Sequence, residues 1–208
     1  MVGAGRSEII RALFGVDKTE KGKKIFVDGK EVTIKQPVDA IKAGFGYVPE
    51  DRKLEGLCLY RSITFNSVMV YLKNLVRHFL VDDKKALQKT NEMIKRLNTK
   101  VNDPGDNVDQ LSGGNQQKVV VAKWLMMEGM KVLLLDEPTR GIDVGAKYEI
   151  YKLIDSLAKQ GVSIIVVTSE LPELLGICDR IMVINRGEVS GILNREEFSQ
   201  EAVMRLCV

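Results

Sequence analysis

Short, continuous apolar runs alternate along this chain with segments in which apolar residues recur at helical spacing. The runs Val132–Leu135 and Ile164–Val167 contain only apolar residues, which is typical of strands buried on both faces of a parallel sheet. A further strand is expected at Gly44–Val48. Helical spacing predicts helices at Ser7–Phe14, Pro37–Ala43, Gly114–Met127, Tyr148–Ala158, Pro172–Cys178 and Phe198–Leu206. Because strands alternate with helices, we expect an α/β fold built on a mostly parallel sheet.

Turns that contain glycine predict two hairpins beside this sheet. The first joins Ile25–Val27 to Val32–Ile34, and the second joins Ile181–Ile184 to Glu188–Ile192. The segment Ile63–Leu97 differs from both, because its apolar residues follow a helical spacing. We therefore expect an all-helical insertion there.

Composition narrows the class of protein. The chain has 208 residues, of which 45% are hydrophobic and 28% are charged, as in ordinary globular domains. Its net charge of +3 comes without a clustered basic run, which argues against a nucleic-acid partner. Three cysteines are too few, and odd in number, for a secreted disulfide framework. No apolar stretch approaches the roughly 20 residues that a membrane-spanning helix needs.

Two carboxylates follow the strand in VLLLDEP. Asp136 and Glu137 stand at its carboxyl end, where α/β sheets bind ligands. In P-loop NTPases the first such carboxylate holds Mg²⁺ and the second polarises the attacking water. A helix cap or a solvated turn is the alternative interpretation of this dipeptide.

Two glycine-containing motifs precede predicted helices. In LSGGNQQK, the hydroxyl of Ser112 and the backbone N–H groups that follow would form an anion site at a helix N-terminus, or else a plain N-cap. The other motif, VGAGRSE, is half of a P-loop in which Gly5 and Ser7 match and Arg6 stands at the lysine position. Alone, it is equally a glycine turn before a helix.

In this order and spacing, the three motifs together resemble the nucleotide-binding domain of ABC transporters, over essentially the whole chain. The corresponding segments are Leu111–Lys118 for the signature motif, Leu133–Glu137 for Walker B, Gly141–Asp143 for the D-loop and Tyr47–Asp51 for the Q-loop. GAGRSE, YVPEDRK and DEPTRGIDVGAK look more narrowly like the C-terminal half of double-domain ATP-binding subunits that serve ribose, xylose and galactose or methyl-galactoside import. ITFNSV and SELPELLGICDRI favour the galactose type.

The resemblance implies a P-loop NTPase core over residues 1–56 and 111–208, with a helical subdomain at about 57–110. It also implies that the chain starts partway through the P-loop. The first strands of the family's sheet would then be missing, and one sheet edge would be exposed.

The same resemblance implies ATP and Mg²⁺ as cofactors and assigns the site residues. Glu137 is the expected catalytic residue, Ser7 and Asp136 are expected to hold Mg²⁺ directly or through water, and Asp143 belongs to the D-loop. The expected nucleotide-binding residues are Gly3, Ala4, Gly5, Arg6, Ser7, Glu8, Glu50 and Ser169. The residues expected to contact ATP on a partner domain are Leu111, Ser112, Gly113, Gly114 and Gln116.

Three positions depart from the family pattern, and all three belong to one nucleotide site. Arg6 replaces the P-loop lysine, Glu50 replaces the Q-loop glutamine, and Ser169 replaces the switch histidine. A guanidinium is larger than an ammonium and spreads its charge, and a serine is not a cation at neutral pH. The only histidine, His78, lies in the predicted insertion, where we expect a surface or packing role. We expect this site to hydrolyse ATP poorly.

The intact signature motif implies partners. These would be a second ABC nucleotide-binding domain with an intact P-loop, membrane permease subunits contacted through Glu50–Lys53 and, indirectly, a sugar-binding protein. The chain would then lie peripherally on the cytoplasmic side of the cell membrane. Two alternatives remain open, namely an inactive truncated remnant and a non-catalytic assembly module.

Overall fold

The fold is built on a parallel sheet of three strands, β3, β6 and β7 in spatial order, in a computed structural model that describes residues 5–19 and 22–207. β3 spans Phe45–Val48, β6 spans Val132–Asp136 and β7 spans Ser163–Val167. All three carboxyl ends therefore meet at one edge of the sheet, which is where α/β sheets bind ligands. The predicted α/β class with a parallel sheet is confirmed.

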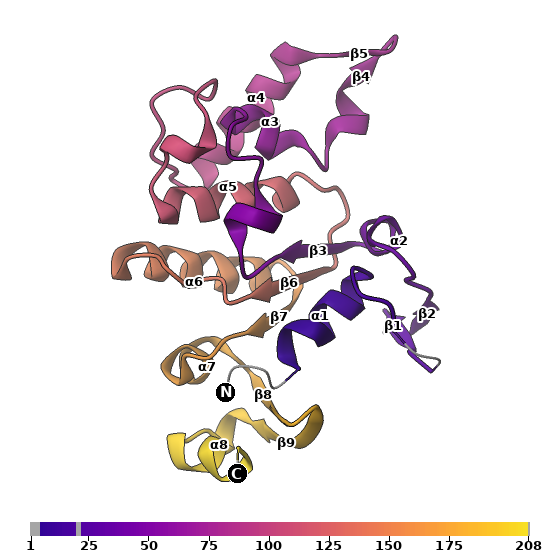
Figure 1. Ribbon diagram of the computed structural model, residues 1–208, viewed down its shortest axis with the longest axis vertical. Helices are drawn as coiled ribbons and strands as arrows, with labels where there is room; N and C mark the ends of the chain where they lie inside the picture. Colours follow the sequence, from indigo (N-terminus) through magenta and orange to yellow (C-terminus); the bar gives the residue numbers. More distant parts are fainter. Residues whose placement is uncertain (1–4, 20–21, 208) are drawn as a thin grey trace.

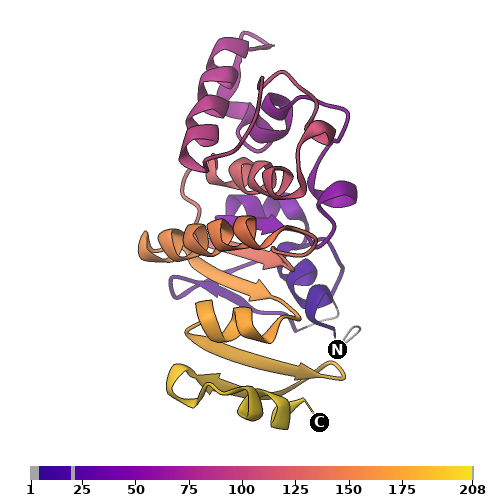
Figure 2. The same cartoon turned by 90° about the vertical axis from the view of Figure 1, so that its left-hand side faces the viewer.

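Helices cover both faces of this sheet (Figures 1 and 2). α1 (Arg6–Phe14) and α2 (Pro37–Lys42) lie on one face, and α5 (Gly113–Leu125) and α6 (Val144–Lys159) lie on the other. The central strand is apolar and fully buried over Leu133–Leu135, as its continuous apolar run predicted.

Both predicted hairpins are present, but the second strand of the first one was placed too late in the sequence, because it ends at Val32 instead of starting there. β1 (Ile25–Val27) pairs with β2 (Lys30–Val32), and β8 (Arg180–Asn185) pairs with β9 (Glu188–Asn194). Among the described strands β7 pairs only with β6, so its outer edge is left open, as expected. The prediction that this apolar run is buried on both faces was wrong, because no residue of β7 is fully buried and Ile165 is 42% exposed at this edge of the sheet. Three short helices follow β7, namely α7 (Leu171–Ile177), the 3₁₀ turn η4 (Arg195–Glu197) and α8 (Gln200–Leu206).

The prediction of an all-helical insertion at Ile63–Leu97 was wrong in part. The segment contains two α-helices and a 3₁₀ turn, but a two-stranded hairpin interrupts them near the top of Figure 1. In chain order its elements are α3 (Ile63–Val68), η2 (Leu72–Leu75), β4 (Val76–Arg77), β5 (Leu80–Val81) and α4 (Asp83–Arg96).

Local residue preferences explain this hairpin. The sequence VRHFLV is rich in β-branched and aromatic residues, which favour strands over helices. His78 and Phe79 form the two-residue turn with φ values of 47° and 70°, so His78 is an exposed turn residue. Asp82 then starts α4, because its carboxylate accepts a hydrogen bond from the backbone N–H of Lys85.

This insertion packs against the C-terminal end of α5 through a hydrophobic cluster of its own. Val68, Leu75 and Ala86 contact Met126, which follows α5. The loop back to the core ends in the 3₁₀ turn η3 (Val108–Gln110). Among the described helices, none combines the length and the apolar character that a membrane-spanning segment requires.

Candidate functional site

The half P-loop forms the start of α1. Gly5 precedes the helix with φ of 86°, a left-handed conformation that glycine adopts without steric cost. Arg6 and Ser7 follow as its first residues. Glu8 is exposed on the same helix. The other two predicted residues of this loop, Gly3 and Ala4, lie outside the described residues.

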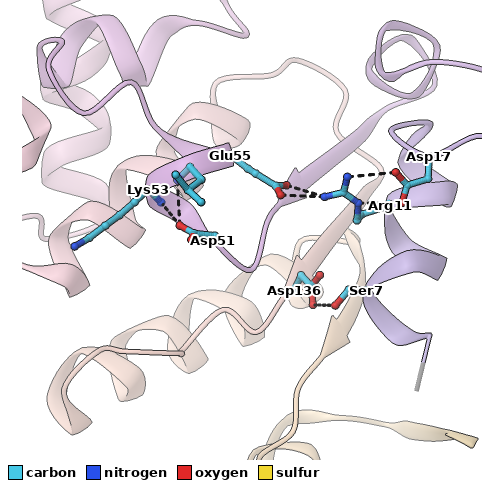
Figure 3. A network of polar contacts seen from close by, with 8 residues as sticks. Ser7, Arg11, Asp17, Asp51, Lys53, Glu55 and Asp136 are labelled. Atoms are coloured by element: carbon cyan, nitrogen blue, oxygen red, sulfur yellow. Dashed lines mark hydrogen bonds and ion pairs between the residues drawn. The ribbon is translucent and has the colours of Figure 1, made fainter. Parts of the chain in front are cut away.

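Ser7 and Asp136 meet at the carboxyl edge of the sheet, although they are 129 positions apart in sequence (Figure 3). The Ser7 hydroxyl donates a hydrogen bond of 3.1 Å to the Asp136 carboxylate, which is buried at the end of β6. Burial raises the pKa of Asp136, and the hydrogen bond from Ser7 opposes that rise. A hydroxyl and a carboxylate are oxygen ligands of the kind that Mg²⁺ prefers, so this pair fits the metal role that the sequence predicts.

No cluster of three or more His, Cys, Asp or Glu side chains with metal-ligating geometry occurs in the described part of the chain. Ser7 and Asp136 would therefore supply only part of an octahedral shell. Mg²⁺ in nucleotide sites takes its remaining ligands from phosphate oxygens and water, which is consistent with so small a protein contribution.

Arg6 lies against the same edge. Its guanidinium donates a hydrogen bond of 2.8 Å to the carbonyl oxygen of Thr168 and lies 4.0 Å from the Glu137 carboxylate. Glu137 has φ of 45°, and its backbone N–H donates to Val167 across the strand ends. Arg6 thus connects the two strand ends that carry the predicted catalytic and switch positions.

A cavity of about 440 Å³ opens beside Ser7 and Asp136. Glu50 lines it as well, so three of the predicted site residues share one cavity. The cations that line it are Arg11, Arg52, Lys53 and Arg140. Four carboxylates also line it, those of Glu50, Asp51, Glu55 and Asp136, so the charges of the lining balance and the cavity is polar rather than positive.

Ion pairs hold the loop that follows β3 over this cavity. Glu50 pairs with Arg140, and Glu55 accepts hydrogen bonds of 3.0 Å from Arg11 on α1. Asp17 contacts the other side of the same guanidinium at 2.9 Å (Figure 3). The loop continues as a π-helical turn, η1 (Arg52–Gly56), which the sequence did not predict.

Arg52 connects three of the predicted motifs. Its guanidinium donates to the carbonyl oxygens of Arg140 at 3.0 Å and Gly141 at 3.4 Å, at the start of the D-loop. Its Nε donates to Gln116 on α5 at 3.4 Å. A Cβ on Gly113 would lie 2.7 Å from this guanidinium, so the glycine leaves room for the arginine.

The predicted signature residues lie away from Ser7 and Asp136. Ser112 is the exposed N-cap of α5, where its hydroxyl accepts from Asn115 at 2.9 Å. Ser112, Gly114 and Asp143 line a second cavity of about 270 Å³. Ser112, Gly114 and Asp143 therefore share one surface, which we call the signature face, whereas Gly141 at the start of the D-loop lines the cavity of the half P-loop.

Eight of the described residues that the sequence predicted for the site line neither of these two cavities, namely Gly5, Arg6, Glu8, Leu111, Gly113, Gln116, Glu137 and Ser169. Ser169 is exposed just after β7, beside the carbonyl group of Thr168 that binds Arg6. Leu111 is half-buried before α5, and Gln116 is buried with its amide donating to Val108 at 3.3 Å. Their roles toward a nucleotide stay predictions.

Sequence reasoning missed Arg11, Arg140 and Glu173. Arg11 lies outside every motif, and Arg140 lies within DEPTRGIDVGAK but was given no role; the fold brings both beside the predicted residues. Glu173 is a buried carboxylate on α7 that accepts hydrogen bonds from residues of three segments. A charged residue on the apolar spacing of a short helix was the one available signal.

Comparisons with known proteins agree with these features. The sequence profile described as ABC transporter matches residues 2–140. The ribose import ATP-binding protein RbsA of Lactococcus lactis subsp. cremoris is 52% identical over 99% of this chain and 42% of its own length. The xylose import ATP-binding protein XylG of Geobacillus kaustophilus is 47% identical over 98% of this chain and 40% of its own length. The chain thus spans about two fifths of the length of these relatives.

Solved structures share the fold. The ATP-binding cassette MJ1267 superposes with a TM-score of 0.79 at 19% identity, covering 98% of this chain and 83% of that chain. MJ0796, whose structure is described as a dimeric post-hydrolysis state bound to ADP and phosphate, superposes with a TM-score of 0.76 at 21% identity, covering 95% of this chain and 84% of that one.

Proposed function

The chain belongs to the ABC transporter family, and from this premise we propose that it is an ATP-binding half-module of a monosaccharide importer that completes a partner domain's active site. The observation that carries the proposal is the separation of two faces. Ser112, Gly114 and Asp143 line one cavity, whereas Ser7 and Asp136 line another. A domain with an intact signature face and a substituted P-loop is suited to serve a nucleotide bound by its partner.

The class of substrate comes from the relatives. Proteins named for ribose import and xylose import are 47–52% identical to nearly the whole chain. We therefore propose a monosaccharide as the transported substrate, with a permease and a sugar-binding protein as the other components. The chain would lie peripherally at the cytoplasmic face of the membrane.

At the chain's own site, Ser7 and Asp136 would hold Mg²⁺, and Glu137 would orient water. The metal ion, when bound with ATP, would neutralise the charge that develops on the phosphate oxygens. Arg6 already contacts Glu137 and the end of β7, and Glu50 pairs with Arg140. Because Arg6 and Glu50 are engaged with other side chains, we expect them to assist the hydrolysis of ATP poorly. The site would therefore bind a nucleotide and hydrolyse it slowly.

At the partner's site, the start of α5 would act. Its first backbone N–H groups have no carbonyl partner within the helix, and the positive end of the helix dipole favours an anion. The Ser112 hydroxyl and the N–H groups of Gly113 and Gly114 would contact the γ-phosphate of ATP on the partner. Donors positioned toward developing charge contribute about 10²–10³-fold each to catalysis in enzymes. Asp143 would face the partner across the interface.

Coupling to the permease is proposed for the loop after β3. Glu50, Asp51 and Lys53 are exposed there, between the proposed core (residues 1–56 and 111–208) and the proposed, largely helical subdomain (about 57–110). The contacts of Glu55 with Arg11, and of Arg52 with Gly141 of the D-loop and with Gln116 on α5, would transmit a displacement of this loop to both cavities.

The test is ATP turnover by the purified chain, alone and mixed with an ABC nucleotide-binding domain whose P-loop carries lysine. We expect negligible turnover alone and at least about tenfold stimulation of the partner. Calorimetry with ATP and Mg²⁺ would accompany it. A chain that neither binds ATP nor stimulates the partner would refute the proposal and favour a non-catalytic assembly module or an inactive remnant.

A further inference from the structure

Glu173 is a buried carboxylate that the proposed function does not use. It lies on α7 with 5% of its surface exposed. Its Oε1 accepts hydrogen bonds from the hydroxyls of Thr139 and of Tyr151, the latter at 2.6 Å, and its Oε2 accepts from the Thr168 hydroxyl at 2.9 Å. The Lys147 ammonium lies 3.5 Å from Oε1.

These partners compensate the burial of the charge. Burial by itself raises the pKa of Glu173, but the three hydroxyl donors and Lys147 outweigh it and lower the pKa. The carboxylate is therefore ionised at neutral pH, and both of its oxygens accept hydrogen bonds. A hydrogen-bonded ion of this kind fixes the segments that supply its donors.

The donors come from three segments of the candidate site. Thr139 follows Glu137 by two positions, and Thr168 directly precedes Ser169. Lys147 and Tyr151 belong to the first turns of α6, the helix that Asp143 caps by accepting from the backbone N–H of Ala146. One side chain thus joins the end of β6, the end of β7 and the helix that starts at the D-loop.

The first turn of α6 in turn contacts the signature turn. A Cβ placed on Gly114 would lie 2.6 Å from the Cβ of Ala146, so the two helix starts pack without space between them. Asp143 lines the cavity of the signature face next to Gly114. Any displacement of this turn of α6 must therefore move the signature face or open a gap beside it.

We propose that Glu173 is a positioning residue that fixes the position of the signature face relative to the loops that follow β6 and β7 in the chain's own nucleotide site. The inference rests on the proposed function, because it concerns the face that would serve the partner. Glu173 acts through Thr139, Lys147 and Tyr151, and it touches neither cavity.

The test is hydrogen exchange of the whole chain as wild type and as Glu173→Gln, without nucleotide or partner. The amide keeps the volume and one acceptor but loses the charge opposite Lys147. We expect at least fivefold faster exchange both in residues 138–152, which Glu173 contacts, and in the signature segment 111–118, which it does not. Glu170→Gln is the matched control, because exposed Glu170 pairs with the same lysine, and it should leave segment 111–118 within twofold of wild type.

Faster exchange confined to residues 138–152 and 168–174 would overturn the proposal, since it would show a local structural acceptor only. If Glu173→Gln does not fold, Tyr151→Phe decides, because it removes one donor and keeps the carboxylate. The same pattern at smaller amplitude supports the proposal, and an unchanged signature segment refutes it.

A second readout separates this inference from the proposed function. In the mixture with an intact partner, Glu173→Gln should lower kcat at least threefold and leave the KM for ATP unchanged, because the partner binds the nucleotide. Absence of stimulation by the wild-type chain refutes the proposed function, whereas the exchange result still decides the positioning role. Normal stimulation by Glu173→Gln, with wild-type exchange at the signature segment, refutes the positioning role alone.

Discussion

Replacing Lys123 by methionine should remove a pH dependence of stability that the structure predicts. Lys123 is a buried residue of α5, and its ammonium donates a hydrogen bond of 2.9 Å to the carbonyl oxygen of Gly56, at the end of η1. Burial lowers the pKa of Lys123 from its ordinary value of 10.5 to about 8. Between these two pH values the unfolded chain binds the proton and the folded chain does not.

The sign and size follow from proton linkage. Stability rises with pH wherever the unfolded state binds more protons, so the contribution of Lys123 improves as pH rises above about 8. One pKa unit corresponds to about 1.4 kcal/mol, and the full difference therefore amounts to about 3 kcal/mol. Between pH 7 and 9.5 about 2 kcal/mol of it should be recovered.

The assay is urea unfolding followed by circular dichroism at several pH values from 7 to 9.5. The difference between the wild-type and Lys123→Met curves isolates Lys123, because groups such as Cys178, whose pKa burial raises, titrate alike in both proteins. We expect the wild type to gain about 2 kcal/mol relative to Lys123→Met over this range. Exposed Lys84, changed to methionine, should keep the wild-type slope. Parallel curves for wild type and Lys123→Met would refute the reasoning.

Two further predictions concern single residues. Gly15→Ala should lower the urea concentration at the unfolding midpoint by more than Gly161→Ala does. Both glycines follow helices and have positive φ, but only a Cβ on Gly15 would meet the backbone of Gln36, at 2.8 Å. Equal losses of stability would show that this contact relaxes. Ser7→Ala should weaken ATP binding, measured by calorimetry, about tenfold in the presence of Mg²⁺ and little in its absence. The variant lacks the hydroxyl beside Asp136 that would be a ligand of Mg²⁺. Equal losses of affinity in the two titrations would contradict the metal role.

Much of the fold could be predicted because local patterns dictate it. The apolar run of β6 required burial on both faces, and Gly15 ended α1 as a left-handed cap with φ of 81°. The apolar run of β7 predicted its strand but not its burial, because β7 lies at the open edge of the sheet. The contact of Ser7 with Asp136 was predictable only through the resemblance, since no local pattern joins residues 129 positions apart.

The rest depended on tertiary contacts. The spacing of Val68, Tyr71 and Leu75 continued the helical pattern up to the hairpin at Val76–Val81, and periodicity alone does not mark where it ends. Arg52 reaches carbonyl groups 88 and 89 positions away, and those contacts exist only because β3 and β6 are neighbours.

The most direct test of the central claim is the rate at which the chain stimulates ATP hydrolysis by an intact partner domain when Ser112 is changed to arginine. The account predicts that Ser112→Arg removes the stimulation, with a loss of about 10²-fold or more, because a bulky cation would replace the hydroxyl at the start of α5. Ser190→Arg, the same change at an exposed serine of β9, should keep it. Full stimulation by Ser112→Arg would contradict the claim that this chain acts through its signature face.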